Sequence, residues 1–276
     1  MIQYIIIISF LFFLISLIHH PYRSYTTAIA WISMILLLIF EIPAWLADHN
    51  YVYPALTCIS IILLGITLRI LFETDTHKKE LIFQLTRAAG VAFIIYAPFA
   101  FYEPFGNWLI AQVVQQTGGL LTLLGHPTEL FLWNTFRGNG YSVEIILACT
   151  GIQAISIMLG VTYAVKTTFT QKIIAALMIV PPIYILNLFR NAGVIMAYTE
   201  QWFPYFQTYV GGEQGFASFF WAHNIIAEGL AFLFLLVLAY GLFCFIPTLA
   251  DVAIDILRMY KGEIESFLDR NKIKMK

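Results

Sequence analysis

Long apolar segments separated by short polar ones run along the whole chain. Segments of roughly the 20 residues that a helix needs to cross a bilayer recur seven times. They lie near residues 2–18, 28–46, 54–72, 85–102, 145–165, 173–196 and 219–246. This pattern predicts about seven transmembrane helices, the first of which we expect to be a retained span rather than a removed signal peptide.

Two regions fall outside this pattern. Residues 103–144 carry glutamines and paired glycines among leucines. They predict an outer-side interfacial or re-entrant segment from Asn107 to Leu124, followed by a glycine-rich loop. Residues 250–276 place apolar positions among charges, which predicts an amphipathic tail; its apolar positions are Val252, Ile256, Met259 and Phe267.

The composition agrees with a membrane protein. The 276 residues are 60% hydrophobic and only 11% charged, with a mean hydropathy of +0.81, whereas soluble domains carry about 25% charged residues. The 15 basic residues are balanced by 16 acidic ones, which excludes a nucleic-acid partner. We therefore predict an all-α, polytopic helical integral membrane protein with a single membrane domain over residues 1–276.

The placement of basic residues predicts the orientation. They gather in the loops after the first, third, fifth and seventh predicted spans, which all lie on one side. These residues are Arg23, Arg69, Lys78, Lys79, Arg87, Lys166, Lys172, Arg258, Lys261, Arg270, Lys272, Lys274 and Lys276. By the positive-inside rule that side is the cytoplasm. The chain should thus be a multi-pass protein of the cell membrane, with its N-terminus outside and its tail cytoplasmic.

Three polar side chains within predicted spans are candidates for chemistry. Arg190 lies about six residues, or roughly 9 Å by helix rise, below the outer end of its span. Cys149 lies about four residues below the outer end of the span before it, and His223 within one to two turns of the outer end of the next. The topology therefore predicts all three at similar depth near the outer face.

Each of the three residues alone has a plain structural explanation. Arg190 could bind a lipid phosphate or a backbone carbonyl, Cys149 could pack as a small apolar residue, and His223 could be an interfacial hydrogen-bonding group. Together they could catalyse acyl transfer, because a thiolate is a nucleophile, imidazole moves protons and a guanidinium stabilises negative charge.

Other catalytic motifs are missing from the sequence. The chain has no GxSxG or HExxH motif. Its three cysteines, Cys58, Cys149 and Cys244, show no paired spacing. We therefore expect no metal site and no cofactor.

At these residues the chain resembles the exosortase/archaeosortase family. Its motifs are most similar to those of the archaeal members. The sequence EIILACTGIQ, from Glu144 to Gln153, is similar to the family's cysteine motif. The sequence NLFRN, from Asn187 to Asn191, resembles its arginine motif, and His223-Asn224 fills a third motif. The resemblance covers about residues 85–250.

The resemblance implies a membrane-embedded, sortase-like cysteine transpeptidase. Cys149, Arg190 and His223 would be catalytic, and Asn187, Gly151 and Asn224 would contact the substrate. Its partners would be secreted, membrane-inserted proteins with a C-terminal sorting signal, and a membrane lipid as acceptor. In archaeal members the signal is a Pro-Gly-Phe type motif, a transmembrane helix and a basic end. The alternative is a small-solute or lipid transporter or binding protein that uses Arg190 as an anion site.

Overall fold

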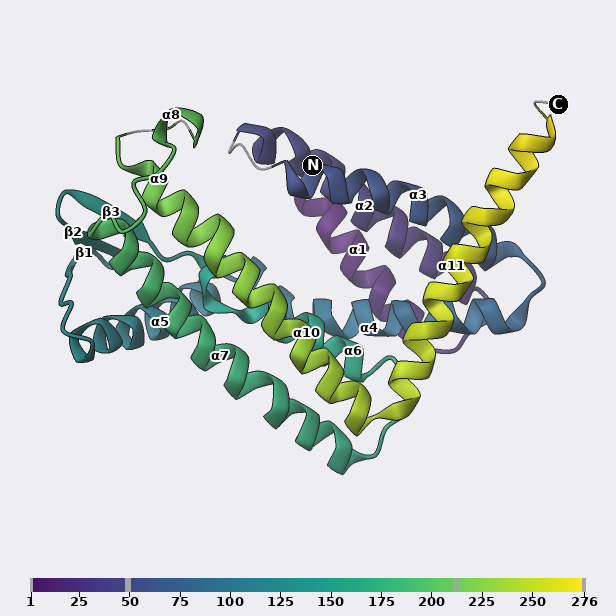
Figure 1. Ribbon diagram of the computed structural model, residues 1–276. Helices are drawn as coiled ribbons and strands as arrows, with labels where there is room; N and C mark the ends of the chain where they lie inside the picture. The colour runs from purple at the N-terminus through teal and green to yellow at the C-terminus, as the bar shows by residue number, and fades with distance from the viewer. Residues whose placement is uncertain (1, 48–50, 211, 213, 275–276) are drawn as a thin grey trace. The chain divides into compact units, whose positions relative to one another are not determined.

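The computed structural model describes residues 2–47, 51–210, 212 and 214–274, so Lys276 and the end of the predicted tail lie outside the described residues. The chain is mostly helical (Figure 1). Its elements are α1 (Ile2–Leu17), α2 (Arg23–Ala47), α3 (Val52–Phe72), α4 (Thr76–Phe101), α5 (Glu103–Leu123), β1 (Glu129–Leu132), β2 (Thr135–Gly138), β3 (Tyr141–Glu144), the 3-10 helix η1 (Leu147–Thr150), α6 (Ile152–Thr162), α7 (Phe169–Thr199), α8 (Gln207–Val210), α9 (Phe216–Phe219), the π-helix η2 (Phe220–Ala227), α10 (Glu228–Phe245) and α11 (Pro247–Lys274).

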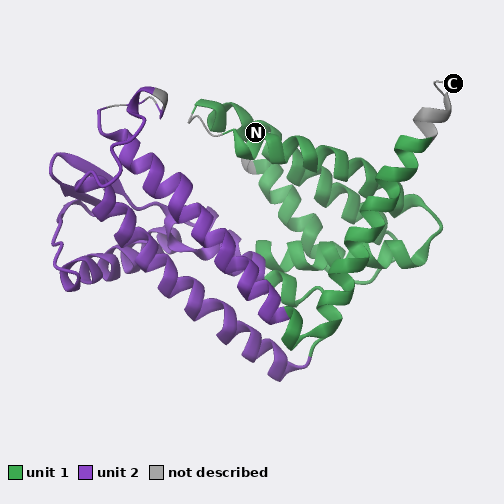
Figure 2. Cartoon of the chain, viewed as in Figure 1, with its two compact units in different colours: residues 1–94, 160–167, 243–276 green, residues 95–159, 168–242 purple. Residues whose placement is uncertain are grey.

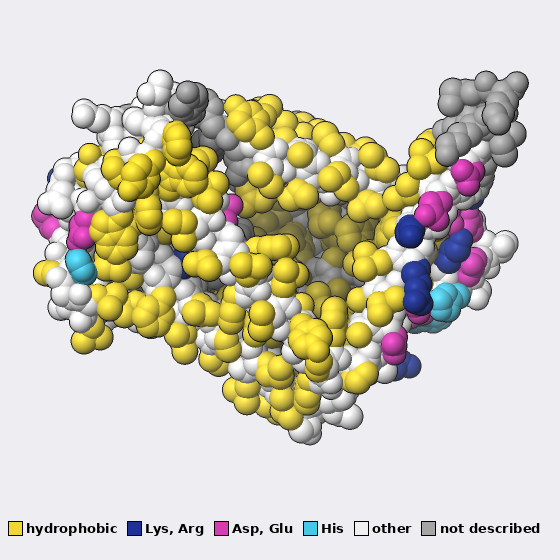
Figure 3. Space-filling view, viewed as in Figure 1, with side chains coloured by type: hydrophobic (Ala, Val, Ile, Leu, Met, Phe, Trp, Pro, Cys, Tyr) yellow, Lys and Arg dark blue, Asp and Glu magenta, His cyan; other side chains and the backbone are white. Residues whose placement is uncertain are grey.

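The helices have the length and composition of a membrane protein, which confirms the predicted fold class. Within the described residues, five helices are long and apolar enough to cross a bilayer: α2, α3, α4, α7 and the continuous run Phe216–Phe245. Large apolar side chains such as Leu230, Leu233 and Val237 are more than half exposed. On the face seen in Figure 3 apolar side chains are widely exposed, whereas charged ones gather along α11.

Two of the seven predicted spans are shorter than expected. The first contains an apolar helix from Tyr4 to Leu17, and the fifth contains only Ile152–Thr162. The prediction of one continuous helix over 145–165 is wrong, because Gly151 adopts a left-handed conformation (φ 78°) that separates η1 from α6.

Contacts between residues divide the chain into two compact units (Figure 2). Unit 1 contains residues 1–94, 160–167 and 243–276. In it the tail helix α11 packs through Val252, Ile256 and Met259 on a core that includes Ile70 and Leu71. Phe267, which we expected on the same apolar face, is instead 61% exposed.

Gly160 packs closely against the backbone of α4 in unit 1. A Cβ atom at this position would lie 2.4 Å from the backbone oxygen of Ala88 and 2.9 Å from the Cβ of Ala92. We expect Gly160→Ala to destabilise the protein, because overpacking a close backbone contact costs about 1–3 kcal/mol. The midpoint of thermal unfolding in detergent should fall. Gly65→Ala is the matched control, since its Cβ would meet nothing within 4 Å, and it should leave the midpoint unchanged or raise it.

Unit 2 contains residues 95–159 and 168–242. Its central helix α7 starts at a capping box, in which the Thr168 hydroxyl accepts from the Gln171 backbone N–H (3.2 Å) and the Gln171 side chain accepts from the Thr168 N–H (2.9 Å). The helix then continues through Pro181 and Pro182 to Thr199. Arg190 and the residues around it therefore lie on a single uninterrupted helix.

The second part of the segment 103–144 differs from the prediction. Residues 103–123 form one regular helix, α5, and the expected glycine-rich loop is a three-stranded antiparallel sheet of order β1-β2-β3. Asn139 and Gly140 form the two-residue turn between β2 and β3, both with positive φ (52° and 84°). An Asn-Gly pair is a common signal for a hairpin turn, but it identifies a hairpin only where strands can be recognised on both sides of it.

One face of the sheet packs on helices of unit 2. Phe136 of β2 and Val143 of β3 join Ile145 in a buried cluster with residues of α5 and α7. The helical members of this cluster are Ile110, Val113, Val114, Leu121, Ala192 and Ile195. The packing fixes β3, and the chain that follows it to η1, against α7.

Candidate active site

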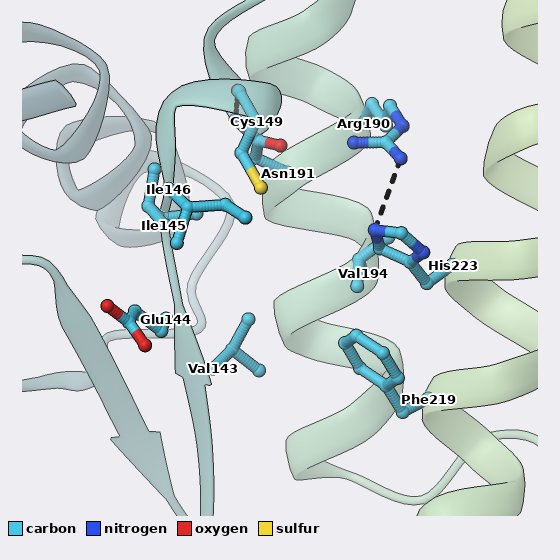
Figure 4. A pocket seen from close by; sticks show the side chains of 10 residues that line it. All are labelled: Val143, Glu144, Ile145, Ile146, Cys149, Arg190, Asn191, Val194, Phe219 and His223. Carbon is cyan, nitrogen blue, oxygen red and sulfur yellow. Dashed lines mark hydrogen bonds between the residues drawn. The ribbon is translucent and has the colours of Figure 1, made fainter. Parts of the chain in front are cut away.

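A pocket in unit 2 brings together the three residues that the sequence singled out. Its volume is about 250 Å³. It is lined by Val143, Glu144, Ile145, Ile146, Cys149, Arg190, Asn191, Val194, Phe219 and His223 (Figure 4). Cys149, Arg190 and His223 come from η1, α7 and η2, so three separate elements converge on one cavity.

Cys149 lies on a tight turn rather than inside a long helix. Its backbone N–H donates to the Ile146 carbonyl oxygen (2.8 Å), and Gly151 ends the turn in the left-handed region. The positive φ favours glycine at this position, and a Cβ on Gly151 would crowd the side chain of Asn187 at 3.3 Å. The half-buried Cys149 points its sulfur into the pocket (Figure 4).

Two asparagines of α7 hold this turn in place. The side-chain amides of Asn187 and Asn191 both donate to the Cys149 carbonyl oxygen, at 2.6 and 2.8 Å. The two residues are one helical turn apart and so share a face of α7. Asn191 was not among the predicted site residues, although its spacing from Asn187 was visible in the motif NLFRN. The pair connects the position of Cys149 to the helix that carries Arg190.

Removing both amides should slow catalysis more than it lowers protein abundance. In Asn187→Ala/Asn191→Ala the Cys149 carbonyl loses both donors, and an unsatisfied buried acceptor costs about 1–3 kcal/mol. We expect at least a tenfold loss in the rate of substrate conversion at a normal amount of membrane-inserted enzyme, measured by product formation and immunoblotting. Either single variant, which leaves one hydrogen bond, should lose less. Equal rates in the double variant and the wild type would contradict a positioning role.

Arg190 and His223 contact each other across the pocket. Arg190 Nη2 lies 3.3 Å from His223 Nε2 (Figure 4). A guanidinium has only donors, so Nε2 must be the accepting, unprotonated ring nitrogen. Nδ1 then carries the proton and donates to Asn224 Oδ1 at 2.8 Å. The contacts therefore favour a neutral imidazole whose Nε2 lone pair accepts a hydrogen bond from Arg190 at the pocket.

The ring of His223 is held by its surroundings. Phe219 stacks on it, with ring centroids 4.9 Å apart and an angle of 16° between the planes. His223 also lies in the π-helix Phe220–Ala227, a rare, wider helical form that is frequent at functional sites. The apolar sequence of this segment gives no signal for a π-helix, so periodicity alone could not predict it.

The predicted substrate-binding residues lie just behind the pocket. Asn187 binds the Cys149 carbonyl, Gly151 packs on Asn187, and Asn224 binds His223. The sequence analysis did not select several lining residues, among them Glu144 and Phe219. The Glu144 carboxylate accepts from the Asn134 side-chain amide at 3.0 Å. Four of the ten lining residues, Val143 to Ile146, come from β3 and the segment after it. The sequence did not identify β3 as a strand.

Comparison with known proteins identifies the family. The model of the transmembrane exosortase family (EpsH type) matches residues 2–241. The chain belongs to the exosortase family. This confirms the resemblance noted in the sequence and, with the apolar helices, establishes a membrane protein of this family.

Two curated relatives of this exosortase family member are archaeal proteins. The chain is 27% identical over 211 residues to archaeosortase A of Haloferax volcanii. This alignment covers 68% of this chain and 70% of the relative. It is 28% identical over 208 residues to archaeosortase A of Natronomonas pharaonis, covering 68% of this chain and 65% of the relative. No solved structure shows significant similarity to the chain.

Proposed function

We propose that this exosortase family member is a membrane-embedded cysteine transpeptidase. It cleaves the C-terminal sorting signal of secreted surface proteins and joins the new C-terminus to a membrane lipid. The observation that carries the proposal is the pocket in which Cys149, Arg190 and His223 converge. A thiol, a guanidinium and an imidazole can serve as nucleophile, oxyanion donor and proton carrier in acyl transfer through a thioester.

The proposed reaction has two halves. The Arg190 N–H moves from His223 Nε2 toward the scissile carbonyl oxygen, which frees the Nε2 lone pair. The Cys149 sulfur then attacks the scissile carbonyl carbon while its proton passes to Nε2. The tetrahedral intermediate collapses, the C–N bond breaks, and His223 returns the proton to the leaving amine, which leaves a thioester on Cys149. A lipid headgroup amine then attacks the thioester, and the C–S bond breaks. His223 relays the amine's proton to the sulfur, which regenerates the thiol.

Arg190 stabilises the charge that develops in both halves. Its guanidinium carries five N–H donors, more than His223 can engage, so donors remain for the oxyanion of the tetrahedral intermediate. Asn187 and Asn191 hold the nucleophile through its carbonyl oxygen. Gly151 and Asn224 support this arrangement through their contacts with Asn187 and His223. Direct contact of these residues with the substrate stays a prediction from the sequence.

The proposed setting is the membrane of an archaeal cell. The N-terminus lies outside, the α11 tail is cytoplasmic, and the pocket opens toward the outer face. The substrates are membrane-inserted precursors with a Pro-Gly-Phe type motif, one transmembrane helix and a basic end. The basic residues of alternate loops and the identity to the two archaeosortases A support this setting.

The proposal is tested on the mature C-terminus of one such precursor. Mass spectrometry of the protein from wild-type cells should show a truncated C-terminus linked to a lipid. The same protein from cells lacking the enzyme should keep its transmembrane helix. A transporter or binding protein would instead leave the C-terminus identical in both strains, and that result would refute the proposal.

A further inference from the structure

One wall of the pocket consists of four consecutive residues, Val143 to Ile146. Side chains along an extended chain alternate between its two sides, and Figure 4 shows Val143 and Glu144 on opposite sides of the ribbon. A cavity that touches all four residues therefore lies beside their main chain as well as their side chains. The backbone of β3 and of the residues after it forms part of this wall.

Among the described residues, the backbone edge of β3 on the side away from β2 has no partner strand. β3 is the last strand of the sheet, and it pairs with β2 on one side. The Ile145 N–H donates to the Asn134 carbonyl oxygen (2.8 Å), and the register pairs Glu144 with Thr135. In an antiparallel ladder this places the N–H and C=O groups of Ser142 and Glu144 away from β2. An edge of this kind is a template for an added strand.

The edge leads directly to the nucleophile. The carbonyl oxygen of Ile146, two residues beyond β3, accepts the Cys149 N–H. Val194, Phe219 and His223 form the other side of the pocket, so the space beside β3 is largely apolar. An extended peptide that pairs with this edge would run toward the sulfur of Cys149.

We propose that the precursor segment flanking the scissile bond binds as an extended strand on the free edge of β3, through hydrogen bonds to the main chain of Ser142 and Glu144. The proposal rests on the transpeptidase function above. Pairing through the backbone supplies affinity independent of side chains, while the apolar pocket selects the side chains that enter it. Strand pairing also holds the peptide extended, so that a nucleophile can reach its scissile carbonyl from the side.

The first test compares two substitutions at one position. Glu144→Pro removes the N–H that faces the pocket but no hydrogen bond to β2, and proline is tolerated at such edge positions. Glu144→Ala removes the same carboxylate and keeps the N–H. We expect Glu144→Pro to process a co-expressed precursor at least about tenfold more slowly than Glu144→Ala, because a hydrogen bond is lost and the proline ring obstructs the added strand.

The integrity of the variants is measured independently of the precursor. In a Cys58→Ala/Cys244→Ala background Cys149 is the single thiol of the chain. Alkylation by iodoacetamide, a small reagent that needs no strand pairing, should proceed equally in both Glu144 variants. Unequal alkylation or abundance would show that proline has disturbed the fold, and the second test then decides.

The second test scans the precursor. Residues before its transmembrane helix are replaced singly by alanine and by proline. Strand addition predicts that positions tolerating alanine but not proline alternate along the segment, because every second N–H faces β3. Equal processing by Glu144→Pro and Glu144→Ala together with no alternation would overturn the proposal. If Cys149→Ala still processes the precursor, the transpeptidase function itself fails, which is a separate outcome.

Discussion

Cys149→Ala is expected to abolish processing and to leave full-length, membrane-inserted precursor in the cell. The sulfur is the proposed nucleophile, and no other residue that lines the pocket carries a thiol or hydroxyl group. The enzyme should still fold, because the hydrogen bonds from Asn187 and Asn191 go to the backbone oxygen of Cys149 and survive the substitution. The measurement is the ratio of precursor to mature protein on an immunoblot, at a matched amount of enzyme.

The other two cysteines provide the controls. Cys58 and Cys244 are exposed on α3 and α10, and neither of them lines the pocket. Cys58→Ala and Cys244→Ala should process the precursor at the wild-type rate. Cys149→Ser should be nearly as inactive as Cys149→Ala, because an alkoxide forms far less readily than a thiolate. Normal processing by Cys149→Ala would rule out covalent catalysis at this residue.

Arg190→Lys is expected to lower the rate of processing by about 10²–10³-fold, the usual cost of losing one oxyanion-stabilising donor. Lysine keeps the positive charge but not the planar fork of donors. The substitution would remove the contact between Arg190 Nη2 and His223 Nε2, which fixes the ring nitrogen that accepts a proton. The precursor should accumulate while enzyme abundance stays normal.

Arg137→Lys is a matched control for this change. Arg137 lies in β2 of the same unit, with its guanidinium 3.4 Å above the ring of Phe131 and outside the pocket lining. Its replacement by lysine should leave processing within about twofold of wild type, since single exposed cation–π contacts are worth about 0.5–1 kcal/mol of stability. A near wild-type rate for Arg190→Lys would reduce Arg190 to a supporting charge and leave Cys149 and His223 as a dyad.

The sequence predicted the helical membrane fold and the residues that meet in the pocket. The length of the apolar segments identifies the membrane spans. A thiol, a guanidinium and an imidazole within such segments are conspicuous, because polar groups cost free energy in apolar surroundings. Placing the three on successive spans at similar depth was enough to bring them together. What this reasoning could not supply was the detailed position of Cys149, because the apolar run 145–165 reads as one helix regardless of the turn at Gly151.

The sheet escaped prediction for a different reason. Its strands are four residues long, and all four residues of β1 are exposed, so alternation between polar and apolar positions is too short to read. Asn139-Gly140 marked a turn, but without visible strands on either side it indicated only a loop. Phe219 and Val194 were likewise indistinguishable by sequence from residues that face lipid. The wall beside Cys149 is therefore a finding of the structure.

The central claim, a thioester on Cys149, is tested most directly by trapping it. Hydroxylamine attacks thioesters and would replace the lipid amine as acceptor. Membranes containing the enzyme and a precursor are treated with hydroxylamine, and the C-terminus of the released protein is identified by mass spectrometry. The account predicts a C-terminal hydroxamate that forms with wild-type enzyme and not with Cys149→Ala. A C-terminal carboxylate formed at an unchanged rate, with no hydroxamate at any hydroxylamine concentration, would contradict it.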